Sequence, residues 1–188
     1  MTRPTATEVS DRALVLYAFS RRGTIEFVVS ESGGDADRVA QAEQARAETD
    51  RWLERESVEA ALTDLEHALL AAPSGSWPRE AVADAMWRKE SFGVLLWALE
   101  HLAELPPYPD EFAQPALDDA ITRYGSVSSF RAQGHLRPAD HIERAWMEAD
   151  AWFGATEGRT GDDANVASIA AERFRALSWL RDRDAAPA

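Results

Sequence analysis

The spacing of apolar residues along the chain is helical over most of its length. The clearest segment runs from Pro78 to Leu105, where apolar side chains would cover one broad face of a helix. Shorter helical segments are predicted at 63–72, 115–124, 138–153 and 166–182. A further helix at 35–56 is predicted from its good helix formers and is expected to be largely exposed. The pattern predicts an all-α fold, a single-domain irregular bundle of about six to eight helices.

The segment 11–30 allows two interpretations. As a helix, it brings Leu14, Ala18, Ile25 and Val28 together on one face. As a β-hairpin, it would form two strands around the sequence Arg-Arg-Gly, and its β-branched residues favour strands locally. Neither arm alternates cleanly between apolar and polar residues, so the helix is preferred and the N-terminal hairpin is kept as the alternative.

The helical segments also set the expected domain limits. Residues 1–10 are expected to be disordered, residues 11–183 to form one helical domain, and residues 184–188 to form a disordered tail. A single core suits a chain of 188 residues, because one domain commonly contains ~100–200 residues.

Several element boundaries carry local signals. Thr63 followed by Glu66 has the spacing of a capping box, which starts a helix by satisfying two backbone donors. Ser76 is a candidate N-cap for the long helix that begins near Pro78. Four prolines between 106 and 115 then end that helix and predict a loop.

Two arginines stand on apolar helix faces. On a helical wheel Arg88 falls between Leu95 and Leu99, and Asp84, one turn earlier, is its nearest candidate partner. Arg173 falls in the middle of the apolar face of the last helix. A buried guanidinium is costly unless it is paired and hydrogen-bonded, so both arginines are expected to have acidic partners.

Two glutamates complete this candidate network. Glu172 neighbours Arg173 in the sequence, and Glu90 lies at the margin of the polar side of the long helix, where it is expected to reach solvent or a shallow groove. The network is predicted to be either an internal structural cluster or the lining of a functional pocket. Its predicted members are Asp84, Arg88, Glu90, Glu172 and Arg173.

The same segments resemble a known bacterial family. The run WRKESFGVLLWALEHLAELP and the later ERFRALSWL are similar to the Trp-Arg-x-Glu start, the Leu-Leu-Trp-Ala-Leu continuation and the terminal Ala-Leu-x-Trp-Leu of the family designated domain of unknown function 4272. The resemblance covers most of the chain from Trp52 to Leu180 and implies a mainly helical fold, without implying an activity. It places the family's polar positions on Arg88, Glu90, Glu172 and Arg173.

The chain is strongly acidic, with a formal net charge of −13 and a pI near 4.7. Its electric field therefore repels phosphate backbones and anionic lipid, so neither nucleic acid nor a membrane is expected as a partner. No stretch approaches the ~20 apolar residues of a membrane span, and the N-terminus has no apolar signal core. Cytoplasmic location is expected, and the pattern does not predict an oligomeric state.

Motifs for catalysis and for metal binding are missing from the sequence. The chain has no cysteine, which excludes thiolate chemistry and cysteine-based metal sites. Its four histidines do not stand at metal-ligand spacing, and His101 with Glu104 is assigned to a solvated helix face. No nucleophile elbow, dinucleotide fingerprint or phosphate loop occurs. We expect no catalytic residue, no metal site and no cofactor.

Two tryptophans, Trp77 and Trp97, are expected as surface contacts, because large aromatic residues outside an apolar face often anchor protein partners. Together with the charge, they favour a non-catalytic protein-interaction module, such as an inhibitor or immunity protein, whose partner is basic. The alternative is a small-molecule enzyme or binder with a pocket at Arg88, Glu90 and Arg173 for an anionic ligand.

Overall fold

The computed structural model describes residues 2–160 and 163–185. These residues form eight α-helices and one short 3-10 helix, and they contain no strand. The predicted all-α fold is confirmed, and the segment 11–30 is helical rather than a hairpin. Of the predicted tail, residues 186–188 lie outside the described part of the chain.

The helices belong to two compact units. Unit 1 comprises Met1–Ala13 and Glu90–Ala188, and unit 2 comprises Leu14–Lys89. The boundaries lie inside two helices, α1 (Ala6–Ser30) and α4 (Arg79–Ala98). Because both boundaries lie inside helices, no proline-rich or glycine-rich linker marks them in the sequence. The sequence therefore did not predict the division into two units.

Helix α1 begins earlier than predicted, at Ala6 rather than Asp11. Its start is a second capping box, in which the Thr5 amide donates to Glu8 Oε2 at 2.7 Å and the Glu8 amide donates to Thr5 Oγ1 at 3.2 Å. Hydrogen bonds from the backbone and the hydroxyl of Thr5 lower the pKa of Glu8. Residues 6–10, expected to be disordered, are therefore helical, and Val9 is buried.

Unit 2 contains most of α1 together with α2 (Ala36–Glu56), the 3-10 helix η1 (Glu59–Ala61), α3 (Asp64–Ala71) and the first half of α4. Asp35 caps α2, and the predicted capping box of Thr63 and Glu66 is confirmed at the start of α3. A Cβ atom added at Gly23 would lie 2.6 Å from the Cβ of Ala85, so α1 and α4 approach closely there. The core side chains of unit 2 include Leu14, Leu16, Phe19, Leu53 and Leu70.

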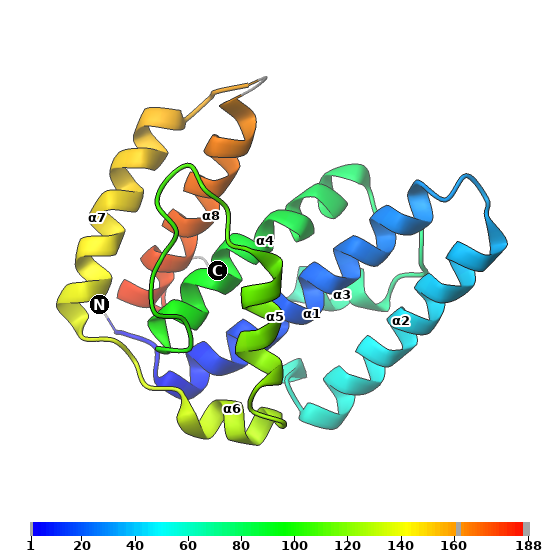
Figure 1. The fold of residues 1–188 in the computed structure, drawn as a ribbon, viewed down its shortest axis with the longest axis horizontal. Coiled ribbons are helices and arrows are strands. Elements are labelled where there is room, and N and C mark those ends of the chain that lie inside the picture. Colours follow the sequence, from blue (N-terminus) through cyan, green and yellow to red (C-terminus); the bar gives the residue numbers. More distant parts are fainter. Residues whose placement is uncertain (1, 161–162, 186–188) are drawn as a thin grey trace. The chain divides into compact units, whose positions relative to one another are not determined.

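Unit 1 contains the start of α1, the second half of α4, and four further helices: α5 (Gln114–Thr122), α6 (Val127–Gln133), α7 (Ala139–Thr156) and α8 (Ala164–Arg181). Helices α7 and α8 run antiparallel along one another (Figure 1). Near one end of the pair Phe153 stacks on Phe174, with ring centroids 4.8 Å apart. Near the other end Arg181 forms two hydrogen bonds with Glu143, at 2.7 and 3.0 Å.

Helix α4 ends at Ala98, before the predicted end at Leu105. The chain reverses at Glu100, which has a φ of 62°. The His101 amide donates to the Leu96 carbonyl at 2.9 Å and the Glu100 amide donates to the Trp97 carbonyl at 3.0 Å, the pattern of a Schellman motif. A glutamate at the left-handed position does not mark a helix end in the sequence as a glycine would. The predicted helix was therefore too long, because Leu102 and Leu105 continue the apolar spacing beyond Ala98.

The positive φ of Glu100 makes a stabilising substitution available. Glu100→Gly is expected to raise the free energy of unfolding by about 0.5–1 kcal/mol, because glycine adopts the left-handed conformation without a steric penalty. Urea denaturation of the two proteins measures the change. The control, Glu104→Gly, changes a nearby exposed residue without a positive φ, and it is expected not to stabilise. Equal effects of the two substitutions would contradict the explanation.

Candidate functional site

A buried ion pair between Glu90 and Arg173 lies in unit 1. The two residues are 0% and 1% exposed. The Nε of Arg173 donates to Glu90 Oε2 at 2.9 Å, and its Nη2 lies 2.8 Å from the same oxygen. The burial predicted for Arg173 is correct. Glu90, in contrast, was expected to reach solvent, but it is buried, as are all of residues 91–99 that follow it.

The Glu90–Arg173 pair holds the loop that follows α4. Arg173 Nη1 donates to the carbonyl of Pro106 at 2.7 Å, and Nη2 donates to the carbonyl of Asp110 at 2.6 Å. The other oxygen of Glu90, Oε1, accepts the backbone amide of Phe112 at 3.0 Å. Each charged group therefore satisfies loop backbone groups as well as its partner, which is what makes a buried charge tolerable.

Glu172 joins this region through Ser91. The Ser91 hydroxyl lies 2.7 Å from Glu172 Oε2 and 2.9 Å from the Glu172 carbonyl, and Glu172 Oε1 pairs with Arg175. Ser91 is the residue that follows Glu90 in α4, so α4 and α8 are joined at two successive positions. Of the predicted network, Glu90, Glu172 and Arg173 therefore come together.

The other two predicted members lie in unit 2. Asp84 is exposed on α4, and Arg88 is half-buried. The helical wheel placed Arg88 and Arg173 alike on apolar faces. Arg173 is enclosed as a whole residue, whereas Arg88 is partly exposed although its guanidinium nitrogens Nε and Nη1 are buried. A wheel shows which side of a helix is apolar and does not show whether that side is fully covered, so it did not indicate that part of the Arg88 side chain is exposed.

A pocket of about 240 Å³ opens beside the Glu90–Arg173 pair. The loop after α4 forms one wall, and α7 and α8 form the others. The lining residues are Leu105, Pro106, Pro107, Tyr108, Ala145, Glu148, Arg173 and Leu177. A pocket at Arg173 was one of the two functional alternatives predicted from the sequence. Tyr108 and Glu148 were not predicted as part of it, because neither the loop nor α7 carries a pattern that shows it to lie against α8.

Tyr108 is held rigidly in this pocket. Its ring stacks on Trp152 of α7 with centroids 5.0 Å apart, and the guanidinium carbon of Arg173 lies 4.8 Å from its centroid. Burial raises the pKa of the Tyr108 phenol to about 12, the positive charge of Arg173 opposes this shift, and the negative charge of Glu148 adds to it. Tyr108 is therefore a neutral, preorganised wall at physiological pH.

Phe112 closes the loop against α4 at a glycine. A Cβ atom added at Gly93 would lie 2.5 Å from the Cγ of Phe112, far inside van der Waals contact. Only a residue without a side chain lets the buried Phe112 ring lie flat on the helix, next to the position where its backbone amide reaches Glu90.

Gly93→Ala is therefore expected to destabilise the protein even though alanine favours helix formation. Overpacking costs about 1–3 kcal/mol, against a gain of roughly 1 kcal/mol in helix propensity. Thermal unfolding followed by circular dichroism measures the balance. Gly154→Ala on α7, where an added Cβ meets nothing within 4 Å, is the matched control and is expected to be neutral or stabilising. A stabilising Gly93→Ala would show that the loop moves away at little cost.

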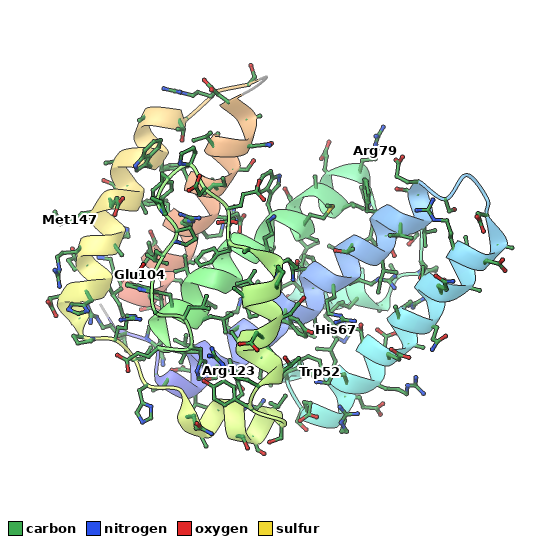
Figure 2. All side chains as sticks on the ribbon, in the orientation of Figure 1. Trp52, His67, Arg79, Glu104, Arg123 and Met147 are labelled. Carbon is green, nitrogen blue, oxygen red and sulfur yellow. The ribbon has the colours of Figure 1, made fainter. Side chains whose placement is uncertain are left out.

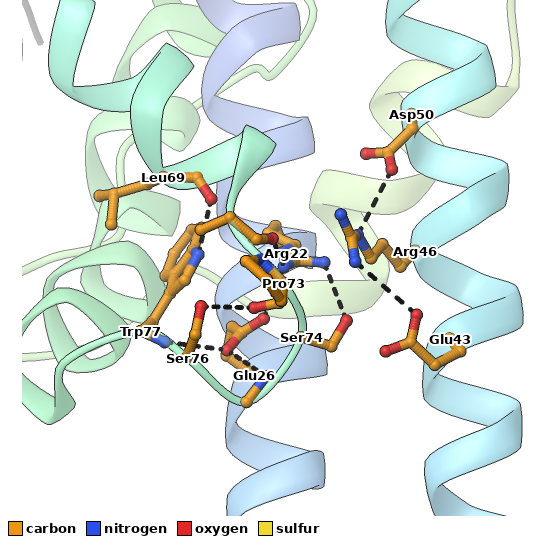
Figure 3. A network of polar contacts seen from close by, with 12 residues as sticks. Arg22, Glu26, Glu43, Arg46, Asp50, Leu69, Pro73, Ser74, Ser76 and Trp77 are labelled. Carbon is orange, nitrogen blue, oxygen red and sulfur yellow. Dashed lines mark hydrogen bonds and ion pairs between the residues drawn. The ribbon is translucent and has the colours of Figure 1, made fainter.

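A second buried ion pair, between Arg22 and Glu26, lies in unit 2 (Figure 3). Both residues belong to α1, they are 0% and 1% exposed, and Arg22 Nη2 lies 2.7 Å from Glu26 Oε1. Burial lowers the pKa of Arg22, and the charge of Glu26 opposes this shift. Sequence analysis missed the pair, although an arginine and a glutamate four residues apart in an apolar run are a usable signal.

The Arg22–Glu26 pair also holds a loop, the one between α3 and α4. Arg22 Nη2 donates to the Ala72 carbonyl at 2.8 Å and Nη1 to the Ser74 hydroxyl at 3.3 Å. Glu26 Oε2 accepts the amides of Gly75 and Trp77, at 2.8 and 3.3 Å (Figure 3). Both buried pairs thus combine one arginine, one glutamate and the backbone of a loop.

Trp77 and Trp97, predicted as surface contacts, are buried, with 7% and 8% exposure. Trp77 packs on Phe19 and its Nε1 donates to the Leu69 carbonyl at 2.7 Å. Arg137 covers Trp97, because its guanidinium carbon lies 5.0 Å from the centroid of the indole ring. The Nε of Arg137 also donates to the Trp97 carbonyl at 2.7 Å. Neither indole is available as a surface anchor. Trp97 lies on the side of α4 that the wheel marked as polar, but Arg137 covers it, and Trp77 lies in the loop before α4 rather than on a helix.

His101 was assigned to a solvated face and is buried instead. Its Nδ1 lies 2.6 Å from the Tyr124 hydroxyl, its ring packs on Phe130 with centroids 4.4 Å apart, and its carbonyl accepts a hydrogen bond from Arg123, which Figure 2 labels. Burial and the nearby charge of Arg123 lower the pKa of His101 from 6.5 to about 4. The ring is therefore neutral in the folded protein at physiological pH.

The lowered pKa of His101 makes stability depend on pH. Above pH 6.5 the ring is neutral in both states, whereas between pH 6.5 and pH 4 the unfolded chain binds the proton more readily. Stability is thus expected to fall by about 2 kcal/mol between pH 7.5 and pH 5. Urea denaturation at the two pH values measures this, and His101→Phe is expected to remove most of the decrease. The same decrease in both proteins would contradict the assignment.

Glu90 of the long helix and Glu172 and Arg173 of α8 hold the loop and the helices of unit 1 together. A protein-family model described as "Domain of unknown function (DUF4272)" matches residues 1–186. The chain belongs to the DUF4272 family. The match extends the resemblance noted in the sequence to α1 and α2, and it assigns no activity. Comparisons with curated proteins and with solved structures find no match.

Two further properties bear on this DUF4272 chain. Within residues 2–160 and 163–185, no helix is long and apolar enough to cross a bilayer. In the same residues, no group of three or more histidine, aspartate or glutamate side chains is arranged to hold a metal ion.

Proposed function

We propose that the protein is a non-catalytic interaction module that binds a basic protein partner. The observation that carries this proposal is the state of the Glu90–Arg173 pair, which is buried and fully engaged with a loop. A charged pair with this environment supports the fold and is not presented to a substrate. The recognition chemistry is then left to the exposed surface.

The exposed surface supports a basic partner. With a net charge of −13, the chain attracts cationic surfaces over the length of the screened field. Exposed carboxylates occur on helices of both units, and such rim charges accelerate association and exclude acidic competitors. The exposed acids of α2 and α7 include Asp37, Glu43, Glu48, Glu54, Glu148 and Asp150.

The alternative of an anionic ligand at Arg173 is weaker. An arginine that binds a carboxylate or phosphate needs free donors that point toward the ligand. All three guanidinium nitrogens of Arg173 already donate hydrogen bonds, to Glu90, to the Pro106 carbonyl and to the Asp110 carbonyl. Its charge is neutralised by Glu90. An incoming anion would meet a site without net positive charge.

Affinity capture with a defined set of variants tests the proposal. The immobilised chain is incubated with lysate of its source cells, retained proteins are identified, and the most abundant one is purified for calorimetric titration. The expected result is a basic protein whose affinity falls with added salt. Two neutralised variants, Glu48→Gln with Glu54→Gln on α2 and Glu148→Gln with Asp150→Asn on α7, remove acids that are exposed.

At least one neutralised variant is expected to bind the partner about tenfold more weakly, since close charge pairs across interfaces have coupling energies of roughly 1.5 kcal/mol or more. The control, Glu48→Asp with Glu54→Asp, keeps the charge and is expected to bind as the wild type does. Retention of no protein beyond the bare resin would overturn the proposal. A partner that binds every variant equally at every salt concentration would do the same.

A further inference from the structure

We propose that the pocket between the loop after α4, α7 and α8 receives one lysine or arginine side chain of the partner, with the cationic head group on Glu148. This inference rests on the proposed function and gives it a location. It concerns only unit 1, because every residue that lines the pocket belongs to that unit.

The size of the pocket suits a single side chain. Its volume is about 240 Å³, which lies below the roughly 300–1,000 Å³ of typical small-molecule sites. A nucleotide or another large cofactor would exceed this space. One long side chain that enters from a partner's surface fills such a pocket in the manner of an interface hot spot.

The walls suit the aliphatic stem of a basic side chain. Leu105, Ala145 and Leu177 contribute apolar surface from three different elements, and two prolines of the loop add to it. Lysine and arginine bury their methylene groups along apolar surface while their charged ends stay near water. Tyr108, fixed between Trp152 and Arg173, forms a wall that needs little ordering on binding, so the loss of entropy is small.

The charges around the pocket favour a cation. Arg173 reaches the pocket, but its positive charge is balanced by Glu90 at 2.8 Å. Glu148 is exposed at the rim, and among the described residues the structure records no ion pair for it. At the Tyr108 phenol the positive charge of Arg173 lowers the pKa, and the negative charges of Glu148 and Glu90 raise it. Two carboxylates, Glu90 and Glu148, therefore face one guanidinium, that of Arg173, and the formal charge of the three groups is negative.

Small amino-acid derivatives test the pocket directly on the full-length chain. N-acetyl-arginine methylamide is titrated in amide NMR spectra, and Trp152, which stacks on Tyr108, serves as a fluorescent reporter. Shifts are expected at Tyr108, Glu148 and Leu177, with a dissociation constant in the millimolar range. N-acetyl-norleucine methylamide, which has an apolar side chain, is expected to bind more weakly, and N-acetyl-glutamate methylamide is expected not to bind.

Two variants separate charge from shape. Glu148→Gln is expected to weaken the arginine derivative roughly three- to fivefold, the range for an exposed ion pair. Asp150→Asn makes the same change of charge at another exposed position of α7 that does not line the pocket, and it is expected to have no effect. Ala145→Leu fills the pocket and is expected to abolish binding, while circular dichroism verifies that the variant is folded.

Several results would overturn the inference. Preference for the glutamate derivative would identify an anion site, equal binding of the norleucine derivative would remove the role of charge, and no shift at the pocket residues would exclude it as a binding site. If the captured partner binds Glu148→Gln and Ala145→Leu as tightly as the wild type, the pocket inference fails while the proposed function stands. If no basic protein is captured but the arginine derivative binds, the proposed function fails and the occupant is a free cation.

Discussion

Replacing Glu90 with alanine is expected to lower the free energy of unfolding by about 3–5 kcal/mol, because the substitution leaves the buried guanidinium of Arg173 without its counter-charge. The same change removes the acceptor of the Phe112 amide. Guanidinium chloride denaturation followed by tryptophan fluorescence measures the loss. This magnitude is a large fraction of the ~5–15 kcal/mol stability of a typical domain, so the variant is expected to unfold near physiological temperature.

A double-mutant cycle shows whether the loss comes from the pair. Glu90→Leu combined with Arg173→Met removes both charges and is expected to be less destabilised than the sum of the two single variants. The double variant is not expected to reach wild-type stability, since the carbonyls of Pro106 and Asp110 lose their donors. Glu104→Ala, an exposed substitution on the same loop, is expected to change stability by no more than about 0.5 kcal/mol. Additive single effects would show that Glu90 and Arg173 act separately.

Glu26→Ala is expected to destabilise unit 2 by a similar amount, about 3–5 kcal/mol. Arg22 is fully buried and would lose its counter-charge, and the amides of Gly75 and Trp77 would lose their shared acceptor. Hydrogen exchange adds a local measurement to the denaturation curve. Both amides are expected to exchange faster in the variant under conditions where the helices remain protected.

An exposed ion pair on α2 provides the matched control. Glu43 is exposed, and its Oε2 lies 3.8 Å from Nη1 of Arg46. Glu43→Ala is therefore expected to change the free energy of unfolding by less than about 1 kcal/mol. If Glu26→Ala lowers the free energy of unfolding no more than Glu43→Ala does, then the Arg22–Glu26 pair does not stabilise the loop between α3 and α4. Unchanged exchange at Gly75 would lead to the same conclusion.

Much of the secondary structure could be predicted from the sequence because its signals are local. The capping box of Thr63 and Glu66, the apolar spacing of α7 and α8, and the proline-rich loop after α4 each act within a few residues. The limits of α1 and α4 were less accurate. Thr5 and Glu8 carried a capping signal that was not used, and the left-handed residue that ends α4 is a glutamate rather than a glycine.

The candidate site was predictable only in part, since its contacts are between distant segments. The apolar surroundings of Arg173 in the sequence correctly indicated a buried guanidinium. They did not indicate that Glu90 would be its partner, because the polar side of a helix is solvated only where no other segment covers it. Trp97 and His101 were misplaced for the same reason. Tyr108 and Glu148 line the pocket only because the loop after α4 and helix α7 lie against α8. No local sequence pattern indicates this packing.

Both buried pairs recognise backbone atoms of their loops. Arg173 binds the carbonyls of Pro106 and Asp110, and Arg22 binds that of Ala72. Every amino acid supplies the same carbonyl oxygen, so these loops can accumulate substitutions during evolution without losing their anchorage, while the two arginines cannot change. The loop after α4 also lines the pocket. Its side chains can therefore differ between related chains while Arg173 holds its backbone in place, and such differences would let related chains bind different partners.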